Sequence, residues 1–215
     1  MASRQPDSGR VYALVAAAGR GERFGGDKLL APWQGRTLLG HVLHTLDRAR
    51  QAGLVSDILV IHRAGDEPVS SLAEAHRATL VTAQGEASEL SDSLRSGFEV
   101  LGRREPGPAA ALVCLGDQPM LRLEVLRALI AEWRDHHAAA IRPSYAEQPD
   151  QPGHPVLLDR TLWRYAGEIA GPRGLGPALE QGGIAIRTLV VKGMNPDVDT
   201  REDLRALDNP ASLPS

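Results

Sequence analysis

Apolar residues recur along the chain in two arrangements, short unbroken runs and longer stretches with helical spacing. The unbroken runs predict buried strands, because the strands of a parallel sheet are covered on both faces. These predicted strands are 11–17, 57–62, 79–83, 110–115, 138–141 and 184–191. The helical spacings predict amphipathic helices. These predicted helices are 38–52, 69–78, 90–102, 123–136 and 200–208.

The residues at the ends of these elements support the assignment. Thr37 is a typical N-cap before the first helix, and Gly53 is a typical residue to close it. Strands and helices alternate along the whole chain, and this order is typical of a mostly parallel sheet with helices on both faces. The sequence therefore predicts a single three-layer, Rossmann-like α/β domain over residues 11–208. Residues 1–10 are expected to be a disordered N-terminus, 145–153 a loop and 209–215 a tail.

Composition and charge exclude several classes of protein. The chain has 215 residues with a formal net charge of −3, which does not favour binding to nucleic acid or to an anionic membrane. No apolar run approaches the roughly 20 residues that span a bilayer, and the polar start lacks the apolar core of a signal peptide. A single cysteine, Cys114, excludes an internal disulfide and a multi-cysteine metal site, and its place in a predicted strand indicates core packing. We therefore expect a cytoplasmic protein with no nucleic-acid or membrane partner.

Two loops follow predicted strands, where α/β sheets bind their ligands. The first is the glycine-rich segment 19–26, whose backbone N–H groups can approach an anion closely. Arg23 and Lys28 add positive charge suited to phosphates. The segment is not a Walker loop, because Leu29 follows the lysine, and its third glycine comes one position too late for GxGxxG. A surface loop that only turns the chain is the alternative.

The second loop is the acidic turn Gly116-Asp117-Gln118-Pro119. A carboxylate at the end of a buried strand can hold Mg²⁺ together with phosphate oxygens, and the alternative is an Asp that caps the next helix. Asp197 and Asp199 precede the last predicted helix and have the same two interpretations. His154, taken alone, is more typical of a structural or surface histidine.

Together these segments resemble the molybdenum cofactor cytidylyltransferases, within the wider MobA-like nucleotidyltransferase family. The family motif LAAGxSxRxGxxK is matched at Ala17, Ala18, Gly19, Arg23, Gly25 and Lys28. The GDQP turn, the segment Gly153-His154-Pro155-Val156 and the segment 195–204, which resembles DIDTPEDL, follow in the family's order. Residues 90–97 resemble its G(M/L)xxSLxxG stretch. The resemblance runs from about Leu14 to Leu204.

The resemblance implies a fold of the nucleotide-diphospho-sugar transferase type and a set of roles. Arg23, Lys28 and Asp117 would be catalytic. Asp117 and Asp199 would bind Mg²⁺, with Asp197 competing for the second position. The implied nucleotide-binding residues are Ala17, Ala18, Gly19, Arg20, Gly21, Arg23, Lys28 and Ser93. The implied acceptor-binding residues are Gln118, Pro119, Gly153 and His154.

The expected activity is Mg²⁺-dependent transfer of CMP from CTP to a molybdopterin-type cofactor with release of pyrophosphate, and a molybdoenzyme is an expected partner. Several positions depart from the family pattern. Gly21 replaces its serine, Glu89 replaces the glycine before Leu90, and residues 25–28 resemble the guanylyltransferase branch. Three alternatives therefore stay open: a guanylyltransferase using GTP, an NAD(P)H-dependent oxidoreductase, and a carrier of the cofactor without turnover.

Overall fold

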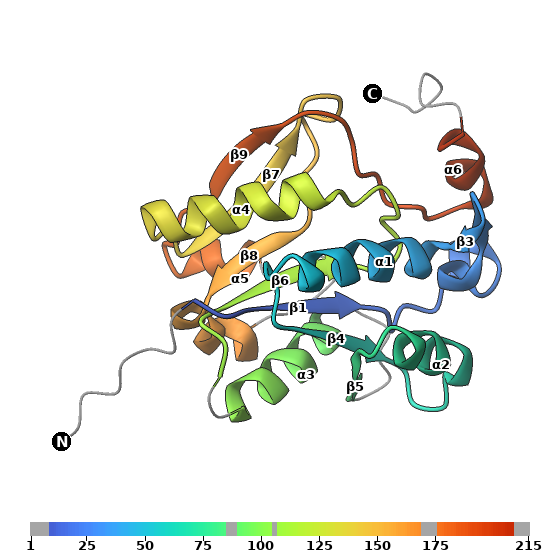
Figure 1. Cartoon of the computed structure of the whole chain (residues 1–215), viewed down its shortest axis with the longest axis horizontal. Helices are drawn as coiled ribbons and strands as arrows, with labels where there is room; N and C mark the ends of the chain where they lie inside the picture. Colours follow the sequence, from blue (N-terminus) through green and yellow to red (C-terminus); the bar gives the residue numbers. More distant parts are fainter. Residues whose placement is uncertain (1–8, 85–89, 105–106, 169–175, 209–215) are drawn as a thin grey trace.

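A central sheet of seven strands organises the molecule (Figure 1). The computed structural model describes residues 9–84, 90–104, 107–168 and 176–208. The strand order is β5-β4-β1-β6-β8-β7-β9. The strands are β1 (Val11–Ala16), β4 (Asp57–His62), β5 (Thr79–Thr82), β6 (Ala110–Leu115), β7 (Ala140–Tyr145), β8 (Val156–Asp159) and β9 (Arg187–Val191).

The predicted mostly parallel sheet is confirmed, with one exception. β1 pairs in parallel with β4 and β6, β4 with β5, and β7 with β9. β8 is antiparallel to both of its neighbours, β6 and β7. The expectation of strict alternation missed this strand, because a four-residue run directly after a proline does not differ by pattern from an apolar loop.

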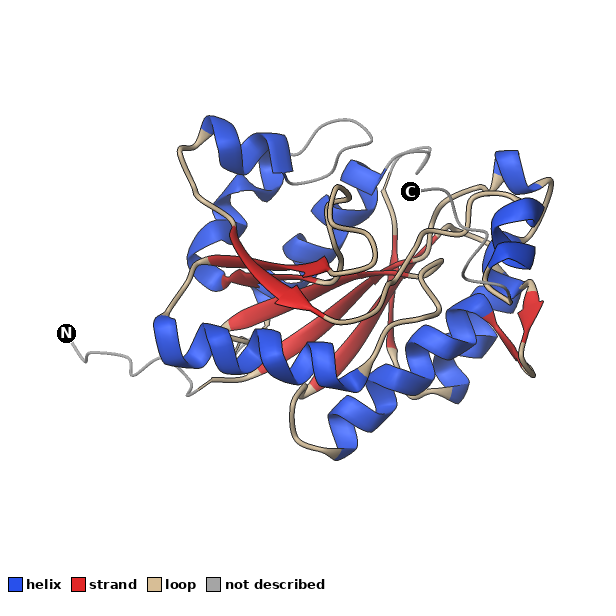
Figure 2. Cartoon of the chain, turned by 90° about the horizontal axis from the view of Figure 1, so that it is seen from above, coloured by secondary structure: helices blue, strands red, loops and turns tan. Residues whose placement is uncertain are grey.

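Helices cover both faces of the sheet, so the predicted three-layer domain is confirmed (Figure 2). One face carries α1, α2 and α4, and the other carries α3, the 3₁₀ helix η3 and α5. The helices are α1 (Leu38–Gln51), α2 (Glu67–Ala75), α3 (Leu90–Arg103), α4 (Leu123–His136), α5 (Gly176–Gln181), α6 (Arg201–Ala206) and η3 (Arg160–Glu168).

Strand β1 shows how one buried strand supplies both cores. Val11, Ala13 and Val15 lie in the hydrophobic cluster with α1 and α4, whereas Tyr12 and Leu14 lie in the cluster with α3. Successive side chains of a strand point to opposite faces, so an unbroken apolar run is what a strand between two helical layers requires. Cys114 in β6 is buried in the first cluster, as its position in a predicted strand indicated.

The boundaries of α1, α3 and α4 were predicted to within one residue, whereas α6 begins at Arg201 instead of residue 200 and ends at Ala206 instead of residue 208. The Thr37 hydroxyl accepts a hydrogen bond from the Gly40 N–H at 3.0 Å, and Gly53 follows α1 with a φ of 69°. The bounds predicted for α4 are those observed. Helix α2 begins at Glu67 instead of residue 69, because the Asp66 carboxylate accepts from the Val69 N–H and caps the first turn. It ends at Ala75 instead of residue 78.

The strand ends were less well predicted. β7 extends over Ala140–Tyr145 instead of 138–141, and β9 begins at Arg187 instead of residue 184. Arg142 and Pro143 interrupt the apolar pattern of β7, which hid its second half. The hairpin of β2 (Pro32–Trp33) with β3 (Arg36–Thr37), the helices η3 and α5 and two short 3₁₀ turns, η1 (Glu22–Phe24) and η2 (Lys28–Leu30), were not predicted. Residues 1–8 and the tail 209–215 lie outside the described residues. Within the described part of the chain, no helix is long and apolar enough to span a membrane.

Candidate active site

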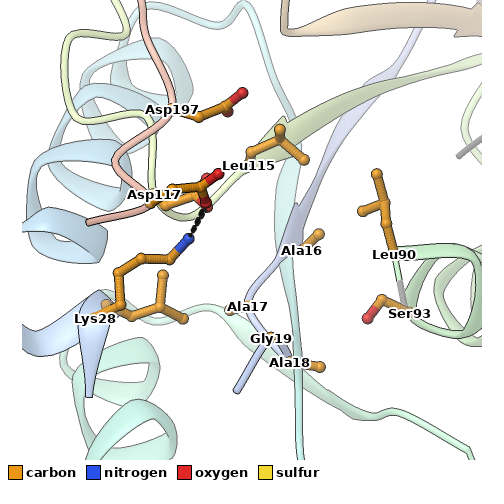
Figure 3. A pocket seen from close by; sticks show the side chains of 12 residues that line it. Ala16, Ala17, Ala18, Gly19, Lys28, Leu90, Ser93, Leu115, Asp117 and Asp197 are labelled. Atoms are coloured by element: carbon orange, nitrogen blue, oxygen red, sulfur yellow. Dashed lines mark hydrogen bonds and ion pairs between the residues drawn. The ribbon is translucent and has the colours of Figure 1, made fainter. Parts of the chain in front are cut away.

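A cavity of about 270 Å³ opens where β1 and β6 end side by side (Figure 3). The glycine loop after β1 and the acidic turn after β6 form one side of it, and Leu90 and Ser93 at the start of α3 form the other. Its lining residues are Ala16, Ala17, Ala18, Gly19, Lys28, Leu29, Leu90, Ser93, Leu115, Asp117, Asp197 and Asp199. Seven sequence-predicted residues are among them: Ala17, Ala18, Gly19, Lys28, Ser93, Asp117 and Asp199.

The glycine loop turns sharply at Gly21. This residue has a φ of 63°, and a Cβ atom placed on it would lie 2.7 Å from the Gly26 carbonyl oxygen. Only glycine fits such a position without a shift of the backbone, which explains the departure from the serine of the family motif. A second cavity of about 270 Å³ lies along this turn, between Arg20, Arg23, Lys28 and Asp199. The predicted nucleotide-binding residues therefore line two cavities that share Lys28 and Asp199.

Lys28 forms ion pairs with both Asp117 and Asp199 at the centre of the site. Its Nζ lies 2.6 Å from Asp117 Oδ2 and 3.0 Å from Asp199 Oδ1. Burial alone would lower the pKa of Lys28, but the charges and hydrogen bonds of the two carboxylates outweigh it and raise the pKa above its usual value of 10.5. An Arg23 guanidinium nitrogen lies 2.8 Å from Asp199 Oδ2. Two cations thus face two carboxylates next to the cavity.

The packing of the chain after Gly193 brings Asp199 to this centre from a distant part of the sequence. The Val198 N–H donates to the Asp117 carbonyl at 3.1 Å. Val198 is fully buried in a small cluster with Phe24 of the glycine loop and Leu38 of α1. Thr200 and Asp203 then form a reciprocal capping box that starts α6. In this arrangement Asp203 caps the helix, which leaves Asp199 free to pair with the two cations.

Asp197 has a different environment from Asp199. It lines the main cavity, and its Oδ1 accepts a hydrogen bond of 2.8 Å from Nε2 of the buried Gln118. Desolvation of the carboxyl, followed by the negative charge of Asp117, raises the pKa of Asp197 to about 6, although the Gln118 hydrogen bond opposes the shift. Asp199, with both cations as partners, is the better placed of the two for a role beside Asp117.

Asn195 is a buried residue of the site that the sequence did not point to. Its Nδ2 donates to Gln118 Oε1 at 3.1 Å and to the His154 carbonyl at 3.4 Å. The amide of Gln118 therefore accepts from Asn195 on one side and donates to Asp197 on the other. This chain of hydrogen bonds connects three of the segments with recognised motifs. Asn195 begins one of those segments, but an asparagine has no chemical pattern that would mark it as buried.

Gly153 and His154 line a third cavity, of about 90 Å³, which shares Leu90 with the main one. Burial lowers the pKa of His154 to about 4, so the imidazole is neutral at pH 7. Pro119 is buried in the acidic turn and lines none of these three cavities. The predicted acceptor-binding residues thus separate into a pair at this third cavity and a buried pair in the acidic turn that lines none of the three cavities.

The carboxylates of Asp117 and Asp199 can hold a small divalent cation if a bound substrate supplies further oxygen ligands. Among the described residues no group of three His, Cys, Asp or Glu side chains could enclose a metal ion. Asp117 and Asp199 nevertheless direct one oxygen each at a single point, the Lys28 ammonium. Mg²⁺ is commonly held by one or two carboxylates completed by substrate phosphates and water. This donor set therefore fits a metal that binds with a phosphorylated substrate.

The fold and site together define a nucleotide-binding α/β domain in which a cluster of Arg, Lys and Asp lies beside the cavity. Residues 13–185 match the MobA-like NTP transferase domain, and the chain belongs to this family of nucleotidyltransferases. It is 28% identical over 185 residues to a probable molybdenum cofactor guanylyltransferase from Pyrococcus horikoshii, with 80% of this chain and 82% of that protein covered.

Other relatives carry different names. A bifunctional enzyme IspD/IspF from Rhodospirillum rubrum is 35% identical over 132 residues, which cover 60% of this chain and 33% of that protein. The chain thus spans about a third of the length of that curated relative. Nicotine blue oxidoreductase from Paenarthrobacter nicotinovorans is 26% identical, with 80% of this chain and 82% of that protein covered.

Solved structures agree with this placement. The crystal structure of Rv0371c from Mycobacterium tuberculosis H37Rv has a TM-score of 0.75 and 31% identity, with 92% of this chain and 97% of that chain covered. A complex of Rv0371c with manganese has a TM-score of 0.72 and 29% identity over the same shares of the two chains. The fold predicted from the sequence is therefore confirmed at the level of the family.

Proposed function

We propose that the protein is a magnesium-dependent cytidylyltransferase, which transfers CMP from CTP to the phosphate of a molybdopterin-type cofactor and releases pyrophosphate. The observation that carries the proposal is the convergence of Lys28, Asp117 and Asp199 at the point where two cavities meet. The GDQP turn and the Ala17-Ala18-Gly19 start of the glycine loop favour CTP over GTP through their resemblance to the cytidylyltransferases.

In this proposal the two cavities divide the nucleotide between them. The main cavity, with Ala17, Ala18 and Ser93, takes the base and ribose. The cavity along Gly21 takes the triphosphate, where Arg23 and Lys28 pair with its oxygens. When the triphosphate binds, both cations have a partner other than Asp199, and the two carboxylates become available. A bound Mg²⁺ would neutralise charge on the phosphates and help to align them.

The chemistry needs little from the protein beyond alignment and charge. An oxygen of the acceptor phosphate forms a bond to the α-phosphorus of CTP, and the bond from that phosphorus to the bridging oxygen of pyrophosphate breaks. The acceptor phosphate is ionised at neutral pH, so no general base has to remove a proton. Arg23 and Lys28 stabilise the negative charge of the leaving pyrophosphate. Gly153 and His154 contact the acceptor from the third cavity, and Gln118 supports them through Asn195, whose Nδ2 donates to Gln118 and to the His154 carbonyl.

An oxidoreductase is the second candidate, because nicotine blue oxidoreductase matches 80% of this chain. It would use the same glycine loop to bind NAD(P)H and would not depend on Mg²⁺. The two candidates differ in their ligands, so thermal unfolding with CTP, GTP, ATP or NADPH, each with and without Mg²⁺, separates them. A ligand at about 100 times its Kd stabilises the folded state by about 2.7 kcal/mol, which is readily measured.

We expect a Mg²⁺-dependent stabilisation that is largest with CTP, followed by pyrophosphate release when molybdopterin is added. A preference for GTP would keep the chemistry and change the product, and stabilisation by NADPH alone would overturn the mechanism. Stabilisation by CTP without release of pyrophosphate from it in the presence of any pterin acceptor would favour a carrier.

The role of Asp117 is tested by Asp117→Asn, with Asp135→Asn on the exposed face of α4 as the matched control. We expect Asp117→Asn to abolish pyrophosphate release while its circular dichroism stays unchanged, and Asp135→Asn to keep full activity. The amide retains the shape of the carboxylate but not its charge. Full activity in folded Asp117→Asn would contradict the metal-binding role.

A further inference from the structure

The third cavity contains a cation with no partner among the residues that the structure describes. Arg142, in β7, lines this cavity together with Gly153 and His154. It is half-buried, and within the described chain its guanidinium makes no ion pair, hydrogen bond or ring contact. Among the described residues that line the cavity there is no Asp or Glu. Arginine in such surroundings is normally paired, because burying a charge without compensation costs free energy.

The position of Arg142 in the sheet explains why it points into the cavity. Its neighbour Ile141 lies in the core cluster with α4, whereas Ala140 lies in the cluster with α3 and η3. Strand alternation places Arg142 on the same face as Ala140. A hydrophobic residue is expected on this face of an interior strand. Because β7 lies between β8 and β9, the presence of a charged residue at position 142 is not explained by exposure at the edge of the sheet.

The rest of the lining is mainly aliphatic, with Leu94, Val113 and Leu158 among the side chains. Its volume of about 90 Å³ is below the roughly 300–1,000 Å³ of sites that enclose a whole ligand. The cavity shares Leu90 with the nucleotide cavity, and the charges of both Arg142 and Asp117 affect the imidazole of His154. It therefore suits one part of a ligand whose other part reaches the main cavity.

We propose that this cavity binds the edge of a flat heteroaromatic ring of the acceptor that carries an anionic substituent, and that Arg142 pairs with that substituent and selects for it. The inference rests on the proposed function, because it takes the ligand to be the acceptor. The anion is distinct from the reacting phosphate, which must lie near Asp117. If Arg142 holds one end of the acceptor and the site near Asp117 holds the other, the reacting phosphate is oriented toward the α-phosphorus of CTP, which favours its attack.

The test compares two pterins that differ in one substituent, pterin-6-carboxylate and 6-hydroxymethylpterin, by quenching of their own fluorescence. We expect wild-type protein to bind the carboxylate at least about tenfold more tightly, which corresponds to about 1.4 kcal/mol. Arg142→Gln should lose this preference, and Arg142→Lys should keep part of it. Arg23→Gln removes a cation from the triphosphate side and should leave the preference in place. Arg134→Gln is the surface control.

Two further measurements separate the possible outcomes. Because Arg142 makes no ion pair or hydrogen bond with the described residues, Arg142→Gln should unfold at the same or a higher temperature than the wild type. Such a result excludes a structural cause for lost binding. CTP with Mg²⁺ should stabilise Arg142→Gln and the wild type equally. Failure of CTP to stabilise either protein would count against the proposed function alone. If neither pterin binds, if wild type does not distinguish them, or if Arg142→Gln keeps the preference, the assignment of Arg142 is wrong.

Discussion

Lys28 occupies the point at which the two candidate metal-binding carboxylates converge, so it should compete with a divalent cation. Its ammonium lies 2.6 Å from Asp117 and 3.0 Å from Asp199. Mg²⁺ needs oxygen atoms at about 2.1 Å, and a second cation cannot share that space. We predict that Lys28→Met increases the affinity for a divalent metal in the absence of nucleotide.

The magnitude follows from the burial of the three side chains. A pair of unit charges about 4 Å apart attracts by about 1 kcal/mol in water and about 4 kcal/mol at an effective dielectric constant of 20. The side chains of Lys28, Asp117 and Asp199 are 13%, 20% and 33% exposed, which places the site between these limits. A net competition of about 1–3 kcal/mol corresponds to roughly a 5- to 150-fold change in affinity.

The assay is Mn²⁺ binding followed by electron paramagnetic resonance of the free ion, with no nucleotide present. Lys192→Met is the matched control, because Lys192 is the other lysine of the chain and is exposed. Lys28→Arg keeps the positive charge and should bind Mn²⁺ as weakly as wild type. A non-hydrolysable CTP analogue should raise the affinity of wild type, because its phosphates give Lys28 another partner. Equal Mn²⁺ affinities for wild type and folded Lys28→Met would refute the competition.

Two further predictions concern the acceptor side. Burial lowers the pKa of His154 to about 4 in the folded protein. Between about pH 6.5 and 4 this histidine is therefore protonated in the unfolded chain but not in the folded one, and the free energy of unfolding falls as the pH falls. In urea denaturation, the decrease in the free energy of unfolding between pH 7 and pH 4 should be smaller by about 1–3 kcal/mol for His154→Gln than for wild type, and an unchanged pH dependence would contradict the shift. Asn195→Leu leaves the buried Gln118 Oε1 without a donor, so urea denaturation at pH 7 should show about 1–3 kcal/mol of destabilisation. A midpoint equal to that of wild type would show that Asn195 does not hold this amide.

The sequence alone determined the elements whose pattern depends on local burial. The runs that became β1, β4 and β6 are apolar at all their buried positions except His62 at the end of β4, since both faces of these strands are covered. The ends of helix α1 were predicted to within one residue, because Thr37 and Gly53 act through their own turns of the backbone. Strand β8 and the second half of β7 were not predicted, because only their pairing partners define them.

For the site, the sequence indicated which residues take part, and the tertiary structure decided which of their side chains face one another. Lys28 and Asp117 were identifiable because each follows a predicted strand in a recognisable motif. Asp199 could not be preferred over Asp197 by spacing, and it was the packing of Val198 that directed one carboxylate to Lys28 and the other to Gln118. Arg142 interrupts an apolar pattern and suggested a strand end. Only the fold shows that it lies in an interior strand facing a cavity, since a side chain's surroundings are set by contacts distant in sequence.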